Sequence, residues 1–217
     1  LLNAIKKANQ SRLDLGYSNS YRAFFAEADG IPGLIIDKYA EYLSIQILSY
    51  AIDLRKDKIV DMLVTLFKPK GIIERSDVSV RIKEGLSEFK GVLYGTVPPF
   101  VQINENGITV EVDLYNGQKT GYFLDQQANH AAIAPSIKQK SVLDCFSHTG
   151  GFGLHAAYYG AKMVTCVDMS QLAIDAIHKH AKINNLNNLT AKKADVFALL
   201  RELQSDNLRY DTIILDP

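Results

Sequence analysis

The sequence has few cysteines, no long apolar run and no leader peptide, and each of these absences excludes a class of protein. The chain has 217 residues, no Trp and two Cys, Cys145 and Cys166. Both cysteines lie in apolar runs, so we expect a reducing, cytoplasmic location and no disulfide framework. No apolar run approaches the roughly 18 residues of a membrane span. No basic and apolar leader opens the chain, so we expect neither a secretory signal nor a membrane partner.

Net charge is also absent, because 24 basic residues balance 24 acidic ones. A chain-wide positive field for nucleic acid is therefore missing, and contact with RNA would need a local patch or a further domain outside this sequence. The chain does not begin with Met, and it stops at Asp216-Pro217, directly after the apolar run 212–215. A bare strand there would leave an unpaired sheet edge, so we expect a fragment of a longer protein. The sequence sets no oligomeric state.

The first half of the chain alternates short apolar runs with turn signals around one helical pattern. We expect a small α+β domain over 13–114, preceded by a helix or linker over 1–12 that joins it to another domain. Asp53 is the expected cap of the helix and Pro69 its end. The helix is expected at 54–67 and the strands at 23–28, 34–39, 42–48, 72–75, 91–94, 100–104 and 108–113.

From about Tyr115 the pattern changes to strands and helices in alternation. Continuous apolar strands between amphipathic helices predict an α/β fold with a parallel, doubly wound, Rossmann-like sheet over 115–217, truncated after its fourth strand. Ser170 is the expected cap of the longest helix. The strands are expected at 141–144, 163–168, 189–193 and 212–215, and the helices at 126–134, 152–159, 171–184 and 197–203.

An acid follows each of the four expected strands. In such sheets the ligand lies beyond the carboxyl ends of the strands. Asp168, after the second strand, suits a ribose diol, because a carboxylate accepts two hydroxyl hydrogen bonds. Asp195 suits an adenine amino group, although it is equally placed to cap the next helix. Asp144 suits the ammonium of a methionine group, and Asp216 completes the edge.

A loop with three glycines, Gly150, Gly151 and Gly153, follows the first of these strands and suggests close approach of a ligand to the backbone. GFGLHA (151–156) satisfies the dinucleotide pattern G-x-G-x-x-A. That pattern should follow the strand directly, whereas Cys145–Gly150 intervene. Carboxylates also repel a pyrophosphate and tolerate a sulfonium. S-adenosylmethionine is therefore favoured, with an NAD-linked oxidoreductase as the alternative and a non-catalytic RNA-binding or assembly module with a vestigial pocket as a third hypothesis.

Five motifs then occur in a familiar order: KTGYFLDQ (119–126), DCFSHTGGF (144–152), DMS from Asp168, DVF from Asp195, and Asp216-Pro217. With this order the chain resembles the class I methyltransferases that methylate C5 of cytosine in large-subunit ribosomal RNA. That family combines a PUA domain, a central α+β domain and a Rossmann-like domain. The resemblance implies S-adenosylmethionine as cofactor and ribosomal RNA as partner.

The resemblance also implies roles for individual residues. The implied methionine side is Asp144, Phe146, Ser147, Thr149, Gly150, Gly151 and Phe152; the ribose side is Asp168 and Met169; the adenine side is Asp195 and Val196; and Lys119, Thr120, Phe123 and Gln126 close the pocket. Asp216 and Pro217 begin the segment that faces the base. A catalytic cysteine that adds to C6 of cytosine is expected further along. No catalytic residue is therefore expected in these 217 residues, which alone should be inactive.

The remaining reactive side chains have ordinary explanations. Cys145 and Cys166 lack an activating base beside them, so we expect small buried strand residues and not nucleophiles. His148 is expected in the loop, with or without cofactor contact. His130, His178 and His180 are expected on solvated helix faces, because their spacing is not that of metal ligands.

Overall fold

The structure, a computed structural model, describes all 217 residues and divides them into two compact units. Unit 1 comprises Leu1–Asn104 and Glu111–Asp125, and unit 2 comprises Glu105–Val110 and Gln126–Pro217. The bounds of these compact units differ from the expected domain bounds at three places. The first helix and residues 115–125 belong to unit 1, and residues 105–110 belong to unit 2.

Unit 1 contains a mixed five-stranded sheet. Its strands are β1 (Ser20–Phe25), β2 (Leu34–Tyr39), β3 (Tyr42–Ile47), β4 (Gly71–Ser76) and β5 (Phe89–Gly95). They lie in the order β1-β2-β3-β4-β5. Only β3 and β4 run parallel, because the helix between them returns the chain to the same end of the sheet. The expected α+β character of this region follows from this arrangement.

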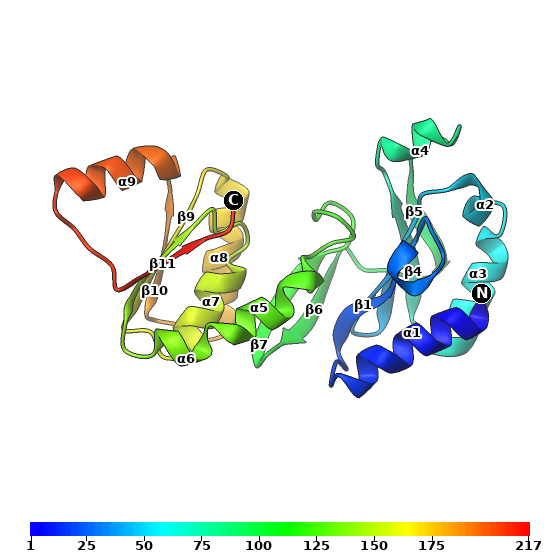
Figure 1. Cartoon of the computed structure of the whole chain (residues 1–217), viewed down its shortest axis with the longest axis horizontal. Coiled ribbons are helices and arrows are strands. Elements are labelled where there is room, and N and C mark those ends of the chain that lie inside the picture. The colour runs from blue at the N-terminus through cyan, green and yellow to red at the C-terminus, as the bar shows by residue number, and fades with distance from the viewer. The chain divides into compact units, whose positions relative to one another are not determined.

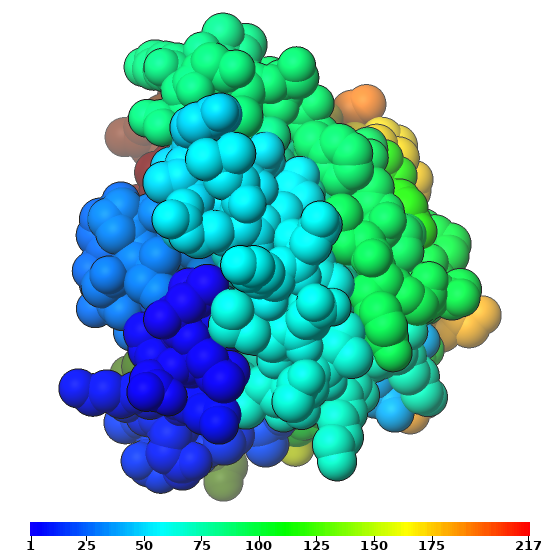
Figure 2. Space-filling model, turned by 90° about the vertical axis from the view of Figure 1, so that its right-hand side faces the viewer, coloured from blue at the N-terminus to red at the C-terminus, as the bar shows by residue number.

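Two helices supply apolar side chains to the core of unit 1. They are α1 (Leu2–Asp14) and α3 (Lys56–Phe67), seen in dark blue and cyan in Figure 2. Ile5 of α1 and Ile59 and Leu63 of α3 belong to one buried cluster with the strands. The pair Ile59 and Leu63 is four residues apart, so both side chains lie on one helical face.

The start of α3 differs from the expected one. The helix begins at Lys56, and Asp53 lies in a preceding short helix, α2 (Tyr50–Asp53). Asp53 is not a cap, because its carboxylate is paired with Lys56 at 3.2 Å and Arg81 at 3.1 Å. Lys68, which follows the helix, has a left-handed φ of 48° and precedes Pro69, so the helix stops there as expected. The remaining helices of unit 1 are η1 (Ala26–Asp29) and α4 (Val80–Lys83).

A buried polar network crosses unit 1. Asp37 is fully buried and accepts two hydrogen bonds from Arg22, both 2.9 Å long. Thr120 donates to the same carboxylate at 2.5 Å and is 2.9 Å from the hydroxyl of Tyr39. The Tyr39 hydroxyl in turn accepts from the amide of Tyr122. This network fixes residues 120–122 to β2, because each buried polar atom needs its partner.

Unit 2 confirms the expected parallel, Rossmann-like sheet (Figure 1). Its strands are β8 (Ser141–Cys145), β9 (Met163–Asp168), β10 (Leu189–Lys193) and β11 (Thr212–Leu215). All neighbours are parallel, in the order β10-β9-β8-β11. The order reverses between β8 and β11, and a change of this kind is where sheets of this class bind ligands.

Helices cover both faces of this sheet. In Figure 1, α9 lies on one side, and α7 and α8 lie on the other. Ser170 caps α8 as expected, because its hydroxyl accepts from the amide of Ala173. The helix expected at 126–134 is divided, since Pro135 begins a new short helix instead of ending one. The helices are η2 (Leu124–Gln126), α5 (Gln127–Ala132), α6 (Ala134–Ile137), α7 (Gly151–Tyr158), α8 (Gln171–Ile183) and α9 (Val196–Ser205).

The strands expected at 100–104 and 108–113 are found as β6 (Phe100–Glu105) and β7 (Ile108–Asp113), which pair with each other as a hairpin. Asn106 and Gly107 have left-handed φ values of 50° and 93°, as tight hairpin turns require. The turn belongs to unit 2, where Asn184, the C-cap residue of α8, bonds both the amide and the carbonyl of Thr109 at 2.7 Å. None of the helices in the structure has both the length and the apolarity that crossing a membrane requires.

We predict that Thr120→Val lowers the free energy of unfolding by roughly 1–3 kcal/mol, because it leaves the buried Asp37 without one of its donors. Chemical denaturation followed by circular dichroism measures the change. The matched control is Thr65→Val on the exposed side of α3, where the hydroxyl bonds only a helical carbonyl. Equal effects of the two substitutions would contradict the importance of the network.

Candidate functional site

Four acids gather at the carboxyl edge of the unit 2 sheet. Asp144 is the penultimate residue of β8, and Asp168 is the last residue of β9. Asp195 follows β10 by two residues, and Asp216 directly follows β11. The strand register places Asp144 opposite Cys166, and Leu215 opposite Cys145, so the ends are level. No lysine or arginine forms an ion pair with any of the four. The edge therefore carries uncompensated negative charge.

Asp144 is the most perturbed of these acids. Its side chain is buried and accepts a hydrogen bond from the amide of Gly153 at 2.9 Å. Burial raises the pKa of Asp144 to about 7, and the carboxylates of Asp216 and Asp168 add to the increase. A positive charge beside this carboxyl group would reverse the effect, because it stabilises the ionised form.

The loop after β8 is held in a strained conformation. Phe146 and His148 have left-handed φ values of 58° and 48°, which cost a non-glycine residue of order 1 kcal/mol or more. The amide of Ser147 donates to Val167 at 3.0 Å, and the amide of His148 donates to Asp168 at 2.9 Å. These bonds tie the loop to the end of β9. The hydroxyl of Ser147 is buried and has no hydrogen-bond partner.

Packing within the protein explains the three glycines of the loop. A Cβ atom on Gly153 would lie 2.1 Å from the sulfur of Cys166, and one on Gly151 would lie 2.6 Å from the ring of His130. A Cβ atom on Gly150 would lie 2.9 Å from Ile177, and this residue also has a φ of 90°. These contacts give each glycine a reason within the protein, and the close approach of a ligand to this backbone stays a prediction.

Asp168 and Asp195 are held by backbone amides. The two oxygens of Asp168 accept from His148 at 2.9 Å and from Ser170 at 2.8 Å. Each oxygen has a second lone pair, so the fixed carboxylate retains capacity for two more donors. Asp195 is the N-cap of α9 and accepts from Ala198 at 2.8 Å. The capping alternative is thus realised, and the second carboxylate oxygen of Asp195 has no protein donor.

The other predicted residues of this edge have diverse surroundings. Phe146 meets Phe197 edge to face at 5.8 Å between centroids, and Phe152 meets His130 in the same way at 4.5 Å. Met169 is exposed, and Val196 is buried in the cluster beneath α9. The hydroxyl of Thr149 lies 3.3 Å from His148. The roles implied for these side chains stay predictions.

The motif 119–126 is divided between the two units. In unit 1, Lys119 pairs with Asp125 at 3.0 Å and lies over the ring of Phe123 at 4.3 Å. Thr120 belongs to the buried network described above. Gln126, in unit 2, accepts from Asn129 at 2.7 Å. Lys119, Thr120 and Phe123 thus have structural partners within unit 1, and their contact with a cofactor stays a prediction.

Both cysteines are free, buried strand residues, as expected. Burial raises the pKa of Cys166 well above its ordinary value, and the neighbouring Asp144 adds to the increase. Burial likewise raises the pKa of the Cys145 thiol. Both groups stay protonated at neutral pH, which makes them poor nucleophiles.

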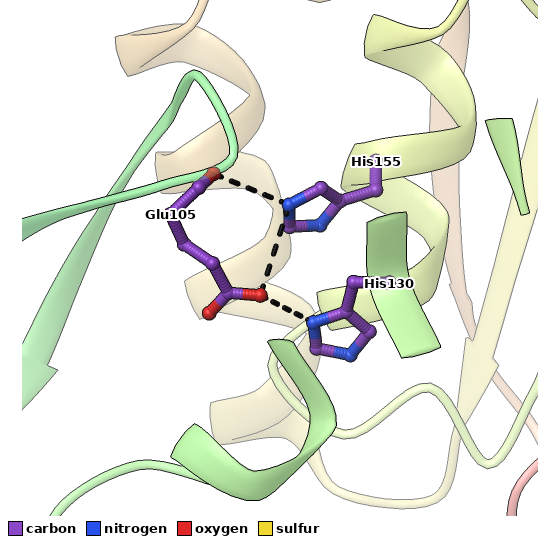
Figure 3. A group of neighbouring side chains, drawn as sticks. All are labelled: Glu105, His130 and His155. Atoms are coloured by element: carbon purple, nitrogen blue, oxygen red, sulfur yellow. Dashed lines mark hydrogen bonds and ion pairs between the residues drawn. The ribbon is translucent and has the colours of Figure 1, made fainter. Parts of the chain in front are cut away.

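The expected surface histidines are only partly found. His178 is exposed, but His130 and His180 are buried, so the prediction for these two is wrong. Their helix faces pack inward, which spacing alone does not show. His155, which no sequence pattern singles out, is fully buried on α7. Figure 3 shows His130 and His155 beside Glu105, with possible metal-ligand atoms within 4.8 Å of one another.

Comparison with known proteins shows similarity along most of the chain. The model of the family described as "Conserved hypothetical protein 95" matches residues 126–217. The Ribosomal RNA large subunit methyltransferase I of Aliivibrio fischeri strain MJ11 is 48% identical over 200 residues, which are 91% of this chain and 50% of that protein. The protein of the same name from Vibrio cholerae is 45% identical over 203 residues, 91% of this chain and 51% of that protein. The chain thus spans about half the length of the curated relatives it matches.

Solved structures show the same fold. A protein from Streptococcus mutans, described as "a putative sam-dependent methyltransferase", is 29% identical and superposes with a TM-score of 0.85. The match includes 100% of this chain and 57% of that protein. A second structure with the same identity, coverage and TM-score is described as "a putative methyltransferase complexed with SAH". The M. jannaschii tRNA m1G37 methyltransferase is 20% identical with a TM-score of 0.61, and the match includes 85% of this chain and 54% of that protein. At this identity the match supports the fold alone. The class I methyltransferase fold expected for unit 2 is confirmed.

We predict that Gly153→Ala destabilises the protein by roughly 1–3 kcal/mol, although alanine is normally the better helix former. The reason is the 2.1 Å separation from Cys166, which the new methyl group cannot keep. Thermal and urea unfolding measure the loss. In the Gly153→Ala background, Cys166→Ala should restore part of the stability, and strictly additive effects would contradict this explanation.

A pH dependence follows from Asp144. Its pKa of about 7 in the folded state exceeds the ordinary 3.8, so the folded form holds a proton that the unfolded chain releases. Stability should therefore fall as the pH rises from about 4 to about 7, by up to about 1.4 kcal/mol per pH unit, and level off above. Asp144→Asn should remove this slope in urea unfolding, while exposed Asp175→Asn should keep it. Parallel curves for all three proteins would exclude Asp144 as the cause.

Proposed function

We propose that the chain is the cofactor-binding part of an S-adenosylmethionine-dependent RNA methyltransferase. The observation that carries the proposal is the set of four acids at the carboxyl edge of a parallel sheet, beside a strained loop and without basic partners. The relatives named ribosomal RNA methyltransferases, of which this chain spans about half, and the similar structure complexed with SAH support the same cofactor.

The residues at this edge fit S-adenosylmethionine better than a dinucleotide. The buried hydroxyl of Ser147 lacks a partner and can serve a polar ligand atom. Burial raises the pKa of Asp144, and repulsion from Asp216 and Asp168 adds to the increase. A cationic ligand would stabilise the ionised carboxylate, whereas a pyrophosphate would add further repulsion. The loop 146–150 is preformed by its bonds to β9, so binding needs little reordering. These features disfavour the NAD-linked alternative.

Each acid then has a role in binding the cofactor or the target base that is compatible with its surroundings. Asp168, oriented by two amides, accepts the two ribose hydroxyls. The free oxygen of Asp195 accepts from the adenine amino group, and Asp144 faces the ammonium group. When bound, the cofactor supplies an electrophilic methyl group on a positively charged sulfur. Asp216 and Pro217 begin the segment that faces the target base.

For the target we propose C5 of a cytosine in large-subunit ribosomal RNA. The motifs 119–126 and 144–152 carry this part, and the relatives' names give the ribosomal subunit. C5 becomes nucleophilic when a thiolate adds to C6, and the base must leave its stack to be reached. Neither Cys145 nor Cys166 suits this step, because both thiols are buried with raised pKa values. The required thiol therefore belongs outside these residues, and a cytoplasmic location is part of the same proposal.

Calorimetric titration of the full-length protein tests the cofactor. S-adenosylmethionine should bind and NAD should not. Asp168→Asn should weaken binding by roughly ten- to hundredfold, because a neutral amide accepts the ribose hydroxyls less strongly. The control Asp175→Asn lies on the exposed side of α8 and should leave the affinity unchanged. Tighter binding of NAD, or no effect of Asp168→Asn, would overturn the assignment.

Methyl transfer tests the target. Ribosomal RNA incubated with the full-length protein and labelled S-adenosylmethionine should yield 5-methylcytidine in nucleoside mass spectrometry. A methyl group on another base or on ribose would refute the cytosine part and leave the cofactor part standing. RNA binding without any transfer would favour the non-catalytic module.

A further inference from the structure

A cluster of one carboxylate and two imidazoles lies in unit 2, and the proposed methyl transfer does not use it (Figure 3). Glu105 ends β6, His130 lies on α5, and His155 lies on α7. Their side chains are 0%, 5% and 0% exposed. Three segments far apart in the sequence thus bring together three groups that ordinarily prefer water or a partner.

The two nitrogens of His155 both face oxygen atoms. Nδ1 lies 2.7 Å from the carbonyl of Gly151, and Nε2 lies 3.2 Å from the carbonyl of Glu105 and 3.7 Å from its Oε1. A neutral imidazole has only one N–H group, so it donates to one side only. The shorter contact favours a proton on Nδ1. The lone pair of Nε2 then points at two oxygens, and a cation between them would turn this repulsion into attraction.

The carboxylate of Glu105 also lacks a donor for one of its oxygen atoms. Its Oε1 is 2.5 Å from Nδ1 of His130, whereas Oε2 is buried without a hydrogen-bond partner. No lysine or arginine is paired with Glu105; its only ion-pair partners are the two histidines. A buried carboxylate without a basic partner is costly, and metal coordination compensates its charge. The oxygen that faces both histidines is Oε1, whereas Oε2 points away from them in Figure 3, so Oε1 is the oxygen placed to bind an ion among the three residues.

We propose that Glu105, His130 and His155 form a binding site for a zinc ion, with Nδ1 of His130, Nε2 of His155 and the Glu105 carboxylate as ligands. Two imidazoles and a carboxylate are ordinary zinc ligands, whereas Mg²⁺ and Ca²⁺ prefer oxygen alone. Ligand atoms about 2.0–2.2 Å from zinc lie about 3.3 Å apart in a tetrahedron. The measured separations of 2.5 Å and 3.7 Å from Oε1 to the two nitrogens fall on either side of this value.

The surroundings hold the ligands in place. The bond from Nδ1 of His155 to the Gly151 carbonyl fixes the tautomer that leaves Nε2 free, as second partners of metal-binding histidines commonly do. The His130 ring stacks on His155 at 4.9 Å and meets Phe152 edge to face. The carbonyl of Glu105, 3.2 Å from Nε2, is available as a fourth ligand. The site is closed to solvent, so the ion is structural and joins the hairpin end to α5 and α7.

Metal analysis of the full-length protein tests the site. The protein is treated with a chelator, dialysed and titrated with Zn²⁺, and bound metal is measured by plasma mass spectrometry. About one zinc ion per chain should bind and raise the melting temperature. Glu105→Gln and His155→Gln should each weaken binding by roughly tenfold or more, while His178→Gln, an exposed histidine on α8, should not. Failure of the wild-type protein to bind zinc, or wild-type affinity in Glu105→Gln and His155→Gln, would overturn the proposal.

Cobalt substitution keeps the test decisive if the variants do not fold. Co²⁺ in the wild-type protein should give the visible bands of a four-coordinate nitrogen and oxygen site. A thiolate charge-transfer band in the near ultraviolet would instead place the ion on a cysteine and refute the assignment. Because the test reads metal content and spectra, its result is independent of methyl transfer.

Discussion

The candidate site depends on the close packing of α7 against the strands β8 and β9. The amide of Gly153 donates to the buried Asp144, and its missing side chain makes room for the sulfur of Cys166. This close contact sets where the helix begins and therefore how the chain travels from the end of β8. The left-handed residues Phe146 and His148 follow from that path, because only the five residues 146–150 cross from the strand end to the helix start. The orientation of Asp168 is a further result, since the loop amide of His148 holds its carboxylate.

Much of the fold could be predicted because its signals are local. The ranges 163–168, 189–193 and 212–215 are the strands found, since continuous apolar runs between helices leave few alternatives. Ser170 caps its helix as expected, because capping depends on residues three apart. The acids at the sheet edge could also be predicted, since parallel strands end at one side. Asp53 could not be placed, because its ion pair with Arg81 joins residues 28 positions apart.

The surroundings of several residues of the candidate site depend on contacts with residues far away in the sequence. The glycines at 150, 151 and 153 suggested a ligand, whereas the structure shows Ile177, His130 and Cys166 in the space that a side chain would need. His130 and His155 are buried only because α5 and α7 pack together around Glu105. Thr120 appeared as part of a cofactor motif, yet its hydroxyl is bonded to Asp37, far earlier in the chain. In each case a single tertiary contact decides the environment of the residue.

The buried position of Asp144 has a consequence for the thermodynamics of ligand binding. With a pKa of about 7, this group is partly protonated at neutral pH before any ligand arrives. A cation bound beside it favours the ionised form, so uptake of the ligand is coupled to release of a fraction of a proton. The observed binding enthalpy then includes the heat of protonating the buffer, and it changes with the buffer at constant pH. Affinity for a cationic ligand increases with pH across the same range, so the carboxyl group makes the site responsive to acidity without any movement of the backbone.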